Sequence, residues 1–349
     1  MRLMAFLNKN YRKSFVFALI VIIIATFAAS FLIFKIKETG TDISKILLAK
    51  IPGISFQKAE AKSITLMFVG DIMLDRGIEY MLLKYGKGDY KFPFLKITDY
   101  LKDADILFGN LESVISDKGR KVGSIYSFRA DPKAIEGLVF AGFDVVSVAN
   151  NHIFDYTNKA MEDSFKRLKE AGIEYVGGGF SENEAHTPVI KEVNNTKFAF
   201  LAYTNVGSKT WVATKDSSGI AWLDESIKED IKAARKIADI VIVSMHFGDE
   251  YKSQSNVEQK LFAQLAIDSG ADLVIGHHPH VAEPVEKYKQ GYIAYSLGNF
   301  IFDQGFSTQT MQGLIFKVLI QDKKIKEVNS QEIQLNKFFQ PEIKKETNF

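Results

Sequence analysis

The sequence predicts an α/β fold in which helices cover a largely parallel β-sheet and a second sheet follows. Three observations lead to this prediction: short apolar runs of strand length, amphipathic stretches between them, and later segments that resemble neighbouring antiparallel strands. Continuous apolar runs are typical of strands buried on both faces. Alternation of such strands with helices is typical of parallel sheets. The 349 residues can form one large domain or two ordinary ones.

The predicted elements follow one another at regular intervals. The strands are expected at 64–69, 104–108, 143–148, 240–245 and 273–275. The helices are expected at about 95–103, 132–141, 158–171, 224–237 and 256–269. The second sheet is expected from segments 187–204, 283–298 and 312–335. These elements predict a folded domain over 63–335, followed by a loosely held C-terminal tail over 336–349.

The N-terminal region predicts a membrane anchor. Residues 14–34 carry no charge and are apolar enough to cross a bilayer as one helix. Four basic residues precede this run, which predicts that residues 1–13 stay in the cytoplasm. Residues 35–62 would then link a single-pass anchor in the cell membrane to an extracytoplasmic domain. A cleaved signal peptide is the alternative, but the apolar run is long for such a peptide.

Composition narrows the possible functions. The chain is 46% hydrophobic and 25% charged, which is typical of a globular protein with a sizeable core, and it has no cysteine to form a disulfide or a thiolate nucleophile. Residues 1–38 carry a net charge of +5 within a total of +2, so residues 39–349 carry −3. No basic stripe with interleaved aromatic residues is present, and the sequence predicts no nucleic-acid partner.

Polar side chains stand at the ends of the predicted strands. They are Asp71, Asn110, Glu112, Asn151, His152, His246, His278 and His280. Ligands of open α/β sheets bind outside the carboxyl ends of the strands, so these side chains are expected to converge. Carboxylate, amide and imidazole groups together suit a divalent ion such as Mn, Fe or Zn. Two such ions, about 3.5–4 Å apart, would form a clamp for phosphoryl chemistry.

The segment 272–280 contains half of the six histidines of the chain. Pro279 fixes its own φ and is expected to push His278 towards an extended conformation. His278 and His280 would then project to the same side of an extended segment and could grip a metal ion together. A surface loop that happens to be rich in histidine is the alternative, which the other polar strand ends make less favourable.

Six short motifs occur in order along the chain. They are GD at 70–71, GNLE at 109–112, ANNH at 149–152, HFG at 246–248, GHHPH at 276–280 and SLGNFIFD at 296–303. Over residues 63–325 the sequence resembles the capsule-synthesis family CapA, the poly-γ-glutamate synthesis proteins within the calcineurin-like metallophosphoesterase superfamily. The resemblance implies a four-layer sandwich of two mixed sheets flanked by helices. It also implies a membrane-associated role in making or exporting an anionic polymer of γ-linked glutamate.

The resemblance also implies roles for individual residues. The implied metal ligands are Asp71, Glu112, Asn151, His246, His278 and His280. The implied catalytic residues are His152, which would contact a substrate oxyanion or protonate a leaving group, and Asn151. Residues expected to support the ligands or reach an anionic substrate are Asn110, Arg76, His277, Asn299 and Asp303.

Two positions depart from the pattern of the superfamily. Met73 stands where typical phosphoesterases carry a histidine, and a thioether is a poor ligand for Mn or Zn. Asn110 stands where they carry a bridging aspartate, and its amide is neutral. One ion, a loosely filled pair, and a site without catalysis therefore all stay open.

Three functions are consistent with these features. The first is a membrane-anchored, metal-dependent protein of poly-γ-glutamate or related capsule synthesis, with a polymer ligase and export subunits as partners. The second is a free-standing extracytoplasmic hydrolase for phosphoesters or amide-linked polymers. The third is a non-catalytic scaffold that binds the anionic polymer and whose metal site has decayed at Met73 and Asn110.

Overall fold

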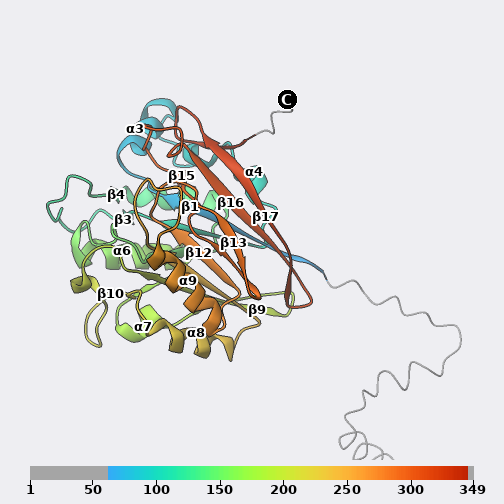
Figure 1. The fold of residues 1–349 in the computed structure, drawn as a ribbon. Helices are drawn as coiled ribbons and strands as arrows, with labels where there is room; N and C mark the ends of the chain where they lie inside the picture. The colour runs from blue at the N-terminus through green and yellow to red at the C-terminus, as the bar shows by residue number, and fades with distance from the viewer. Residues whose placement is uncertain (1–61, 345–349) are drawn as a thin grey trace, which may run out of the picture. The chain divides into compact units, whose positions relative to one another are not determined.

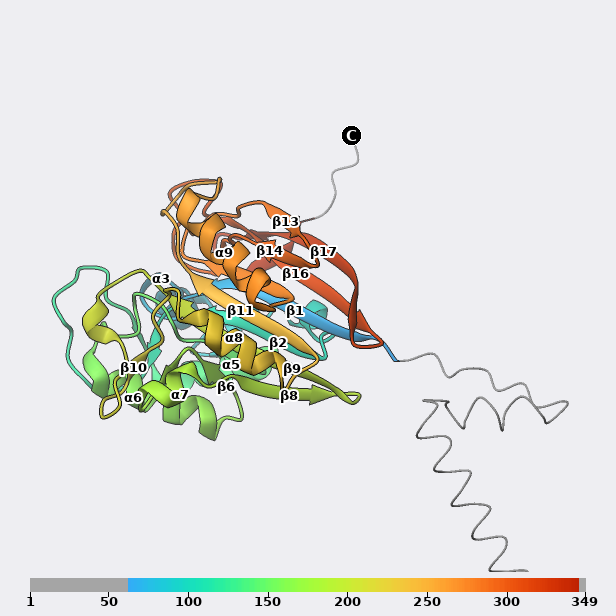
Figure 2. The same cartoon turned by 60° about the horizontal axis from the view of Figure 1, so that its bottom comes forward.

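The computed structural model describes residues 62–344. This part of the chain is mixed α/β, with two main sheets flanked by helices, as the sequence predicts (Figures 1 and 2). The predicted cytoplasmic segment 1–13, the anchor 14–34 and the linker up to residue 61 lie outside the described residues. Within residues 62–344, no helix combines the length and the apolarity that crossing a membrane requires.

The first sheet is antiparallel on one side and parallel on the other. In spatial order its strands are β18 (Pro341–Ile343), β17 (Lys324–Leu335), β16 (Gln312–Gln321), β1 (Ile64–Ile72), β2 (Ile106–Leu111), β5 (Val145–Ser147) and β6 (Glu174–Val176). β1, β2, β5 and β6 are parallel, whereas β16 pairs with β1 in the antiparallel direction. The short strand β15 (Asn299–Ile301) pairs with the carboxyl end of β1.

The second sheet has a parallel centre with one antiparallel strand at each edge. In spatial order its strands are β13 (Val285–Tyr288), β14 (Gly291–Ala294), β12 (Leu273–His277), β11 (Ile240–His246), β9 (Thr196–Thr204) and β8 (Val189–Val193). β9, β11, β12 and β14 are parallel, and β8 and β13 close the two edges as antiparallel strands. Two small pairs, β3 (Val114–Ile115) with β4 (Arg129–Ala130) and β7 (Gly178–Gly179) with β10 (Gly219–Ile220), lie outside these sheets.

The sequence-based assignment of strands to sheets was wrong in two places. The predicted strands 240–245 and 273–275 lie in the second sheet, whereas segment 312–335 returns to the first sheet beside β1. Apolar patterning reports burial but does not select the pairing partner, which is why this error arose. The predicted loose tail was also misplaced at its start, because β18 pairs with β17 and extends the first sheet beyond residue 335.

The core between the two sheets holds them face to face. Leu66 and Phe68 of β1 point into it, while the alternate residue Met67 packs on the opposite face of the sheet. The rings of Phe108 and Phe200, one from each sheet, stack with their centroids 5.7 Å apart. This packing fixes the two sheets relative to each other, and therefore fixes the strand ends that carry the polar residues.

Helices cover the outer face of each sheet (Figures 1 and 2). The first sheet is covered by α3 (Arg76–Tyr85), α4 (Thr98–Leu101), α5 (Ile135–Ala141) and α6 (Thr157–Glu170). The second sheet is covered by α7 (Glu182–His186), α8 (Ile227–Arg235) and α9 (Val257–Ser269). Three single 3₁₀ turns complete the described elements: Phe92–Phe94, Pro132–Ala134 and Lys209–Trp211.

Local sequence explains where several helices begin and end. Asn256 and Gln259 form a reciprocal capping box at the start of α9, and Gly270 ends that helix with a φ of 117°. Asp75 caps α3, a helix that the sequence analysis did not assign.

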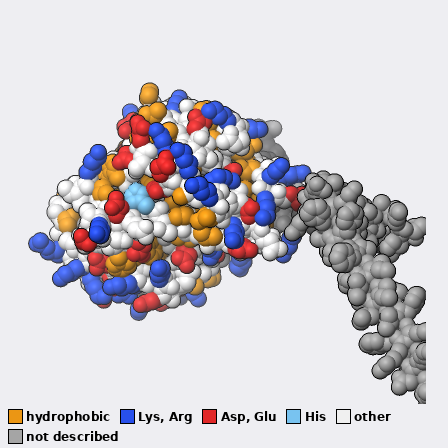
Figure 3. All heavy atoms as spheres, turned by 90° about the horizontal axis from the view of Figure 1, so that it is seen from below, with side chains coloured by type: hydrophobic (Ala, Val, Ile, Leu, Met, Phe, Trp, Pro, Cys, Tyr) orange, Lys and Arg blue, Asp and Glu red, His pale blue; other side chains and the backbone are white. Residues whose placement is uncertain are grey.

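Seen from below, the surface mixes lysine and arginine with aspartate and glutamate, so this face presents no broad field of one charge sign (Figure 3).

Candidate metal centre

The two sheets deliver polar side chains to one shared region. Asp71 at the end of β1 lies beside Asn110 of β2 in the register of the first sheet. His246 at the end of β11 lies beside His277 of β12 in the second sheet. All four side chains are buried. Parallel strands with the same direction in each sheet thus bring residues far apart in sequence into contact.

Two glycines allow the backbone segments around this region to approach closely. A Cβ atom on Gly70, directly before Asp71, would lie 1.9 Å from the carbonyl oxygen of Gly298. A Cβ atom on Gly276 would lie 1.8 Å from the carbonyl oxygen of Tyr295. Any side chain at either position would therefore push the neighbouring backbone, between β14 and β15, away and open the polar cluster.

The histidine loop does not have the extended conformation that the sequence predicted. His278 has a φ of 98° and His280 a φ of 57°, both in the region that favours glycine. The loop is held there by its contacts: the His278 N–H donates to Asp71 Oδ2 at 3.3 Å, and the Tyr251 N–H donates to the Pro279 carbonyl at 2.8 Å. The two rings still converge, with centroids 5.9 Å apart. Such strain is common where a structure holds functional side chains in place.

Asp71 is the carboxylate that ties the two sheets together. Its Oδ1 accepts a hydrogen bond from Asn110 Nδ2 at 2.9 Å and lies 3.2 Å from His277 Nδ1. Its Oδ2 lies 3.2 Å from His280 Nδ1. Burial acts to raise the pKa of Asp71, but the imidazoles of His277 and His280 outweigh it and hold that pKa well below its ordinary value. Asp71 is therefore an anion at neutral pH.

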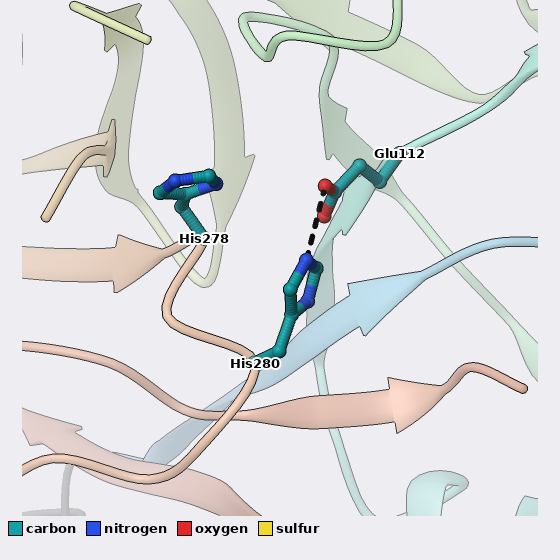
Figure 4. A group of neighbouring side chains, drawn as sticks. All are labelled: Glu112, His278 and His280. Atoms are coloured by element: carbon teal, nitrogen blue, oxygen red, sulfur yellow. Dashed lines mark ion pairs between the residues drawn. The ribbon is translucent and has the colours of Figure 1, made fainter. Parts of the chain in front are cut away.

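Glu112 places one carboxylate oxygen among three imidazoles. Its Oε1 lies 3.7 Å from His280 Nε2 and 3.9 Å from the Nε2 atoms of both His246 and His152. This oxygen is buried and has no hydrogen-bond partner among the described residues. Burial and the nearby charge of Asp71 raise the pKa of Glu112 well above its ordinary value. In Figure 4, Glu112 and His280 point towards each other, beside the ring of His278.

Hydrogen bonds select the free nitrogen of His280. Its Nδ1 lies 3.0 Å from Asn299 Oδ1, which can only accept a hydrogen bond, so Nδ1 carries the proton. The lone pair of Nε2 then faces Glu112. Asn299 is itself fixed, because its Nδ2 donates to Gln304 Oε1 at 3.0 Å and to the Thr310 carbonyl at 2.9 Å. A hydrogen-bonded partner behind an imidazole is the usual arrangement around a metal ligand.

His246 contacts both predicted amide residues. Its Nε2 lies 2.7 Å from Asn151 Oδ1, and its Nδ1 lies 3.3 Å from Asn110 Nδ2. Burial, together with the proximity of His278, lowers the pKa of His246 well below its ordinary value. Burial lowers the pKa of His278 to about 3, with a further contribution from His280. Both rings are therefore neutral at physiological pH, as metal ligation requires.

The donor set fits a divalent metal ion. Glu112, His278 and His280 form one group, and Asp71, Glu112 and His246 form another; within each, one ligand atom per residue lies within 4.8 Å of the others. Nδ1 of His278 and Oε1 of Glu112 are buried and have no hydrogen-bond partner within residues 62–344. Burying such polar atoms unpaired is costly, and a cation would satisfy both. Mixed carboxylate and imidazole donors suit Mn, Fe or Zn.

The two departures from the superfamily pattern have structural explanations. Met73 is fully buried and belongs to the core on the outer face of the first sheet. Asn110 occupies the centre of the cluster. Its Nδ2 lies 3.2 Å from Glu112 Oε2 and is also directed towards Asp71 and His246. Its Oδ1 accepts a hydrogen bond from Asn150 Nδ2 at 3.1 Å. Asn110 thus bridges the carboxylates through hydrogen bonds.

His152 lies at the edge of the cluster with a carboxylate behind it. Its Nδ1 is 2.7 Å from Asp155 Oδ2, and its ring lies against Phe128 with the centroids 4.0 Å apart. Asp155 Oδ2 also accepts a hydrogen bond from the Phe128 N–H at 2.8 Å. Because Asp155 accepts, Nδ1 of His152 is the donor and Nε2 faces the cluster. This geometry suits a proton donor or an oxyanion contact.

Arg76 and Asp303 lie farther out than the other predicted residues. They form an ion pair with each other, and Asp303 Oδ2 also accepts a hydrogen bond from the Gly77 N–H at 2.9 Å. The guanidinium of Arg76 lies 4.4 Å from the centroid of the Phe128 ring. The structure therefore places this pair on the wall above His152, and the other predicted residues in or around the cluster.

A cleft of about 710 Å³ opens above the cluster. Asn151, His152 and His280 lie at its base, and Arg76 and Asp303 form part of its wall. The cleft is thus the route by which a substrate group would reach the buried donors.

The family of this chain follows from a comparison with known families. The family model described as "Bacterial capsule synthesis protein PGA_cap" matches residues 65–304. This chain belongs to that family. The matched range contains every residue of the cluster described above, from Asp71 to Asn299.

Two curated members of the capsule synthesis family are similar over most of the chain. Capsule biosynthesis protein CapA of Bacillus anthracis is 35% identical over 272 residues, which cover 75% of this chain and 65% of that protein. PGA biosynthesis protein CapA of Bacillus subtilis is 33% identical over 255 residues, which cover 71% of this chain and 66% of that protein. The chain therefore spans slightly less than two thirds of either relative.

One solved structure has a similar fold. A phosphatase from Mycoplasma pneumoniae matches with a TM-score of 0.50 at 15% identity, covering 78% of this chain and 94% of that one. At this identity the likeness shows the fold alone, which is metallophosphoesterase-like. The fold of this chain is thus similar to that of one solved phosphatase.

Sequence reasoning missed several residues that shape the site. Asp155 stands three residues after His152, but nothing in the sequence indicates that the chain turns back to form their hydrogen bond. Phe128 and Tyr251 come from loops without a periodic pattern. Asn150 was visible as part of the ANNH motif, and an amide next to a predicted ligand was the signal that could have identified it.

Proposed function

We propose that this chain is a membrane-anchored, metal-binding accessory protein in the biosynthesis or export of poly-γ-glutamate or a related capsule polymer. The observation that carries this proposal is the membership of the capsule synthesis family together with the buried donor cluster. Two similar proteins carry names from capsule and PGA biosynthesis. The proposed anchor rests on the apolar run 14–34, and the basic residues before this run favour a folded domain outside the cell.

A divalent ion would be held by Asp71, Glu112, His246, His278 and His280, with Asn151 completing the set. Such an ion supplies Lewis acidity to an anionic group and lowers the pKa of water. Around it, the protein provides fixed contacts: Asn299 holds the proton on His280 Nδ1, and Asp71 fixes the backbone of His278. One or two ions of Mn, Fe or Zn are consistent with two overlapping donor groups.

A second candidate is an extracytoplasmic metal-dependent hydrolase. The observation that favours it is the pair of His152 and Asp155 at the edge of the donor cluster. Asp155 holds the proton of His152 on Nδ1, so Nε2 faces the cluster, where it could pass a proton to a leaving group or hold an oxyanion. A non-catalytic scaffold for the anionic polymer is the remaining alternative, and it would leave His152 dispensable.

Complementation in the source bacterium tests the proposal. A strain lacking the gene would be supplied with the unaltered full chain, with His278→Ala, or with His186→Ala as a control outside the cluster. We expect polymer output to return with the unaltered and control chains but not with His278→Ala. Equal output from all three would refute a role for the metal site. Genes for a polymer ligase and an export subunit next to this gene would support the pathway.

Localisation is tested separately on the same strains. The full chain is expected in the membrane fraction, with its folded domain cut by protease added to cells whose outer layers have been removed. Recovery in the cytosolic fraction, or full protection from protease, would contradict the predicted single-pass topology.

A further inference from the structure

In the described part of the chain, six aromatic side chains line the cleft above the donor cluster. Its aromatic lining residues are Tyr126, Phe128, Trp211, Tyr251, Phe302 and Phe306. Two of them are unusually open to solvent for large apolar side chains: Tyr126 is 61% exposed and Phe306 is 65% exposed. Exposed aromatic side chains around a cleft are typical of ligand recognition.

The charges in the same wall do not suit a polyanion. Among the described residues that line the cleft, Arg76 is the single lysine or arginine, and Asp303 already pairs with it. Asp155 and the exposed Glu250 add further negative charge. Anionic attraction is therefore confined to the base of the cleft, where a metal ion would lie. Farther up the cleft, the successive carboxylates of a bound polymer would face the aromatic rings and the carboxylates of the protein.

An aromatic path leads from the donor cluster to the rim. The ring of Tyr251 is nearly parallel to that of His280, with the centroids 6.1 Å apart and the planes at 30°. The ring of Phe306 meets Tyr251 edge to face, at 5.1 Å and 86°. Tyr251 is fixed in place, because its N–H donates to the Pro279 carbonyl and its hydroxyl accepts from Gln304 Nε2 at 3.3 Å. If the anionic group of a ligand is bound at the donor cluster, an aromatic ring next to that group would thus contact Tyr251 and Phe306, which are already held in position.

Trp211 lines another part of the cleft wall. It stacks on Phe154, with the centroids 5.5 Å apart and the planes at 14°. Gly207, another lining residue, lies directly against this indole, because a Cβ atom there would approach Trp211 Cζ3 to 2.3 Å. The packing fixes Trp211 in the wall, where its fluorescence can report on an occupant of the cleft.

We propose that the cleft takes a phosphate monoester that carries a planar ring, rather than the interior of an anionic polymer. The phosphate would lie at the donor cluster, and the ring would pack on Tyr251 and Phe306. This inference rests on the proposed metal-binding function and deepens it by naming the substrate class. The capsule pathway would then need this protein to process a ring-bearing phosphate compound instead of cutting the polymer chain.

Binding of two non-hydrolysable phosphonates tests this inference without measuring turnover. The full chain with Trp222→Phe retains Trp211 as its single tryptophan, because the sequence contains only two. Its fluorescence would be titrated in the presence of Mn with phenylphosphonate and with methylphosphonate, which differ in the ring. We expect phenylphosphonate to bind about tenfold more tightly.

Variants then locate the ring. Phe306→Ala should weaken the binding of phenylphosphonate about five- to tenfold and should change the affinity for methylphosphonate by less than about twofold. Phe306→Leu, which keeps apolar bulk, should recover part of the loss. Leu261→Ala removes a side chain that is also exposed, at 61%, but that lies on α9 away from the cleft lining, and it should change neither affinity.

The possible outcomes separate this inference from the proposed function. Equal affinity for the two phosphonates, or an unchanged ratio in Phe306→Ala, would overturn the inference while metal binding stands. Failure of a folded protein to bind either phosphonate or Mn would overturn both. Competition by a γ-linked glutamate oligomer with blocked ends, at the strength of phenylphosphonate, would also contradict the inference, because it would show that polymer interior enters the cleft.

Discussion

Nδ1 of His280 lies 3.2 Å from Oδ2 of Asp71, which links the loop after β12 in the second sheet to the end of β1 in the first. The same nitrogen lies 3.0 Å from Asn299 Oδ1, so one proton is shared between two acceptors and the opposite nitrogen faces Glu112. The metal site therefore depends on how the two sheets are packed, as well as on the identity of its donors.

Asn299→Ala tests the support behind His280. Loss of the amide oxygen leaves His280 free to change its tautomer or ring orientation, so we expect metal affinity to fall about 10- to 100-fold. Competition with a chelator of known affinity measures this change. Asn329→Ala, at an exposed position on β17, is the matched control and should bind metal normally. An unaltered affinity in Asn299→Ala would show that His280 needs no such support.

Glu112→Gln should remove the pH dependence of metal binding. Burial and Asp71 raise the pKa of Glu112, so a metal ion must displace its proton. The pKa values of His246 and His278 are lowered, so these rings are already neutral. Below the pKa of Glu112, affinity should rise about tenfold per pH unit as pH increases. In Glu112→Gln the affinity should be lower and nearly flat with pH; a slope equal to that of the unaltered chain would rule out Glu112 as the titrating ligand.

Asp155→Asn tests whether His152 acts in catalysis. Turnover of an aryl phosphate with added Mn should fall about 10²- to 10⁴-fold in His152→Ala, because proton transfer is lost. Asp155→Asn should shift the pH profile as well as lower the rate, whereas a merely structural effect would leave the profile in place. Metal content, measured on the same samples, should stay unchanged. Full activity in His152→Ala would eliminate the hydrolase alternative.

Glu283, which lies outside the donor cluster, is expected to make the free energy of unfolding depend on pH. It is 3% exposed, and burial raises its pKa to about 7. Between pH 4.5, its ordinary pKa, and 7, the folded state keeps a proton that the unfolded state releases. The contribution of Glu283 to the free energy of unfolding is therefore fully present below pH 4.5 and is lost as the pH rises through 7. The loss is at most about 3 kcal/mol.

Glu283→Gln isolates this contribution. The substitution keeps an acceptor for Gln259 Nε2, which lies 2.7 Å from Glu283 Oε2, but removes the titrating proton. Free energies of unfolding between pH 4 and 8 should lose this part of their pH dependence. The exposed Glu258→Gln provides the control and should follow the unaltered chain. Parallel curves for the unaltered chain and Glu283→Gln would show that another group is responsible.

The sequence was sufficient to predict the α/β alternation and the polar strand ends, because both follow from local patterns. Apolar runs mark β1, β2 and β11, and the polar residue after each run marks the edge where ligands gather. The pairing of β16 with β1 could not be predicted in this way, since it depends on contacts between distant segments. The conformation of His278 was mispredicted for the same reason, because Asp71 and the loop around Tyr251 hold it.

Sequence patterns did not predict which aromatic residues line the cleft together. Tyr251 and Phe306 come from different loops and meet only in the folded chain. The hydrogen bond between His152 and Asp155 likewise depends on a turn with no periodicity. Donor chemistry could thus be predicted from residue types at strand ends, whereas the shape of the space above the donors required the folded chain.

Metal content of the purified full chain, compared with that of His278→Ala, tests the central claim most directly. His186→Ala is the control, because His186 pairs with Asp230 on the helical face and contributes no donor to either group. We expect one or two equivalents of Mn, Fe or Zn in the unaltered and control proteins, and a loss of about tenfold or more in affinity in His278→Ala. Folded protein that binds no divalent metal, or His278→Ala that binds it as tightly as the unaltered chain, would contradict the account.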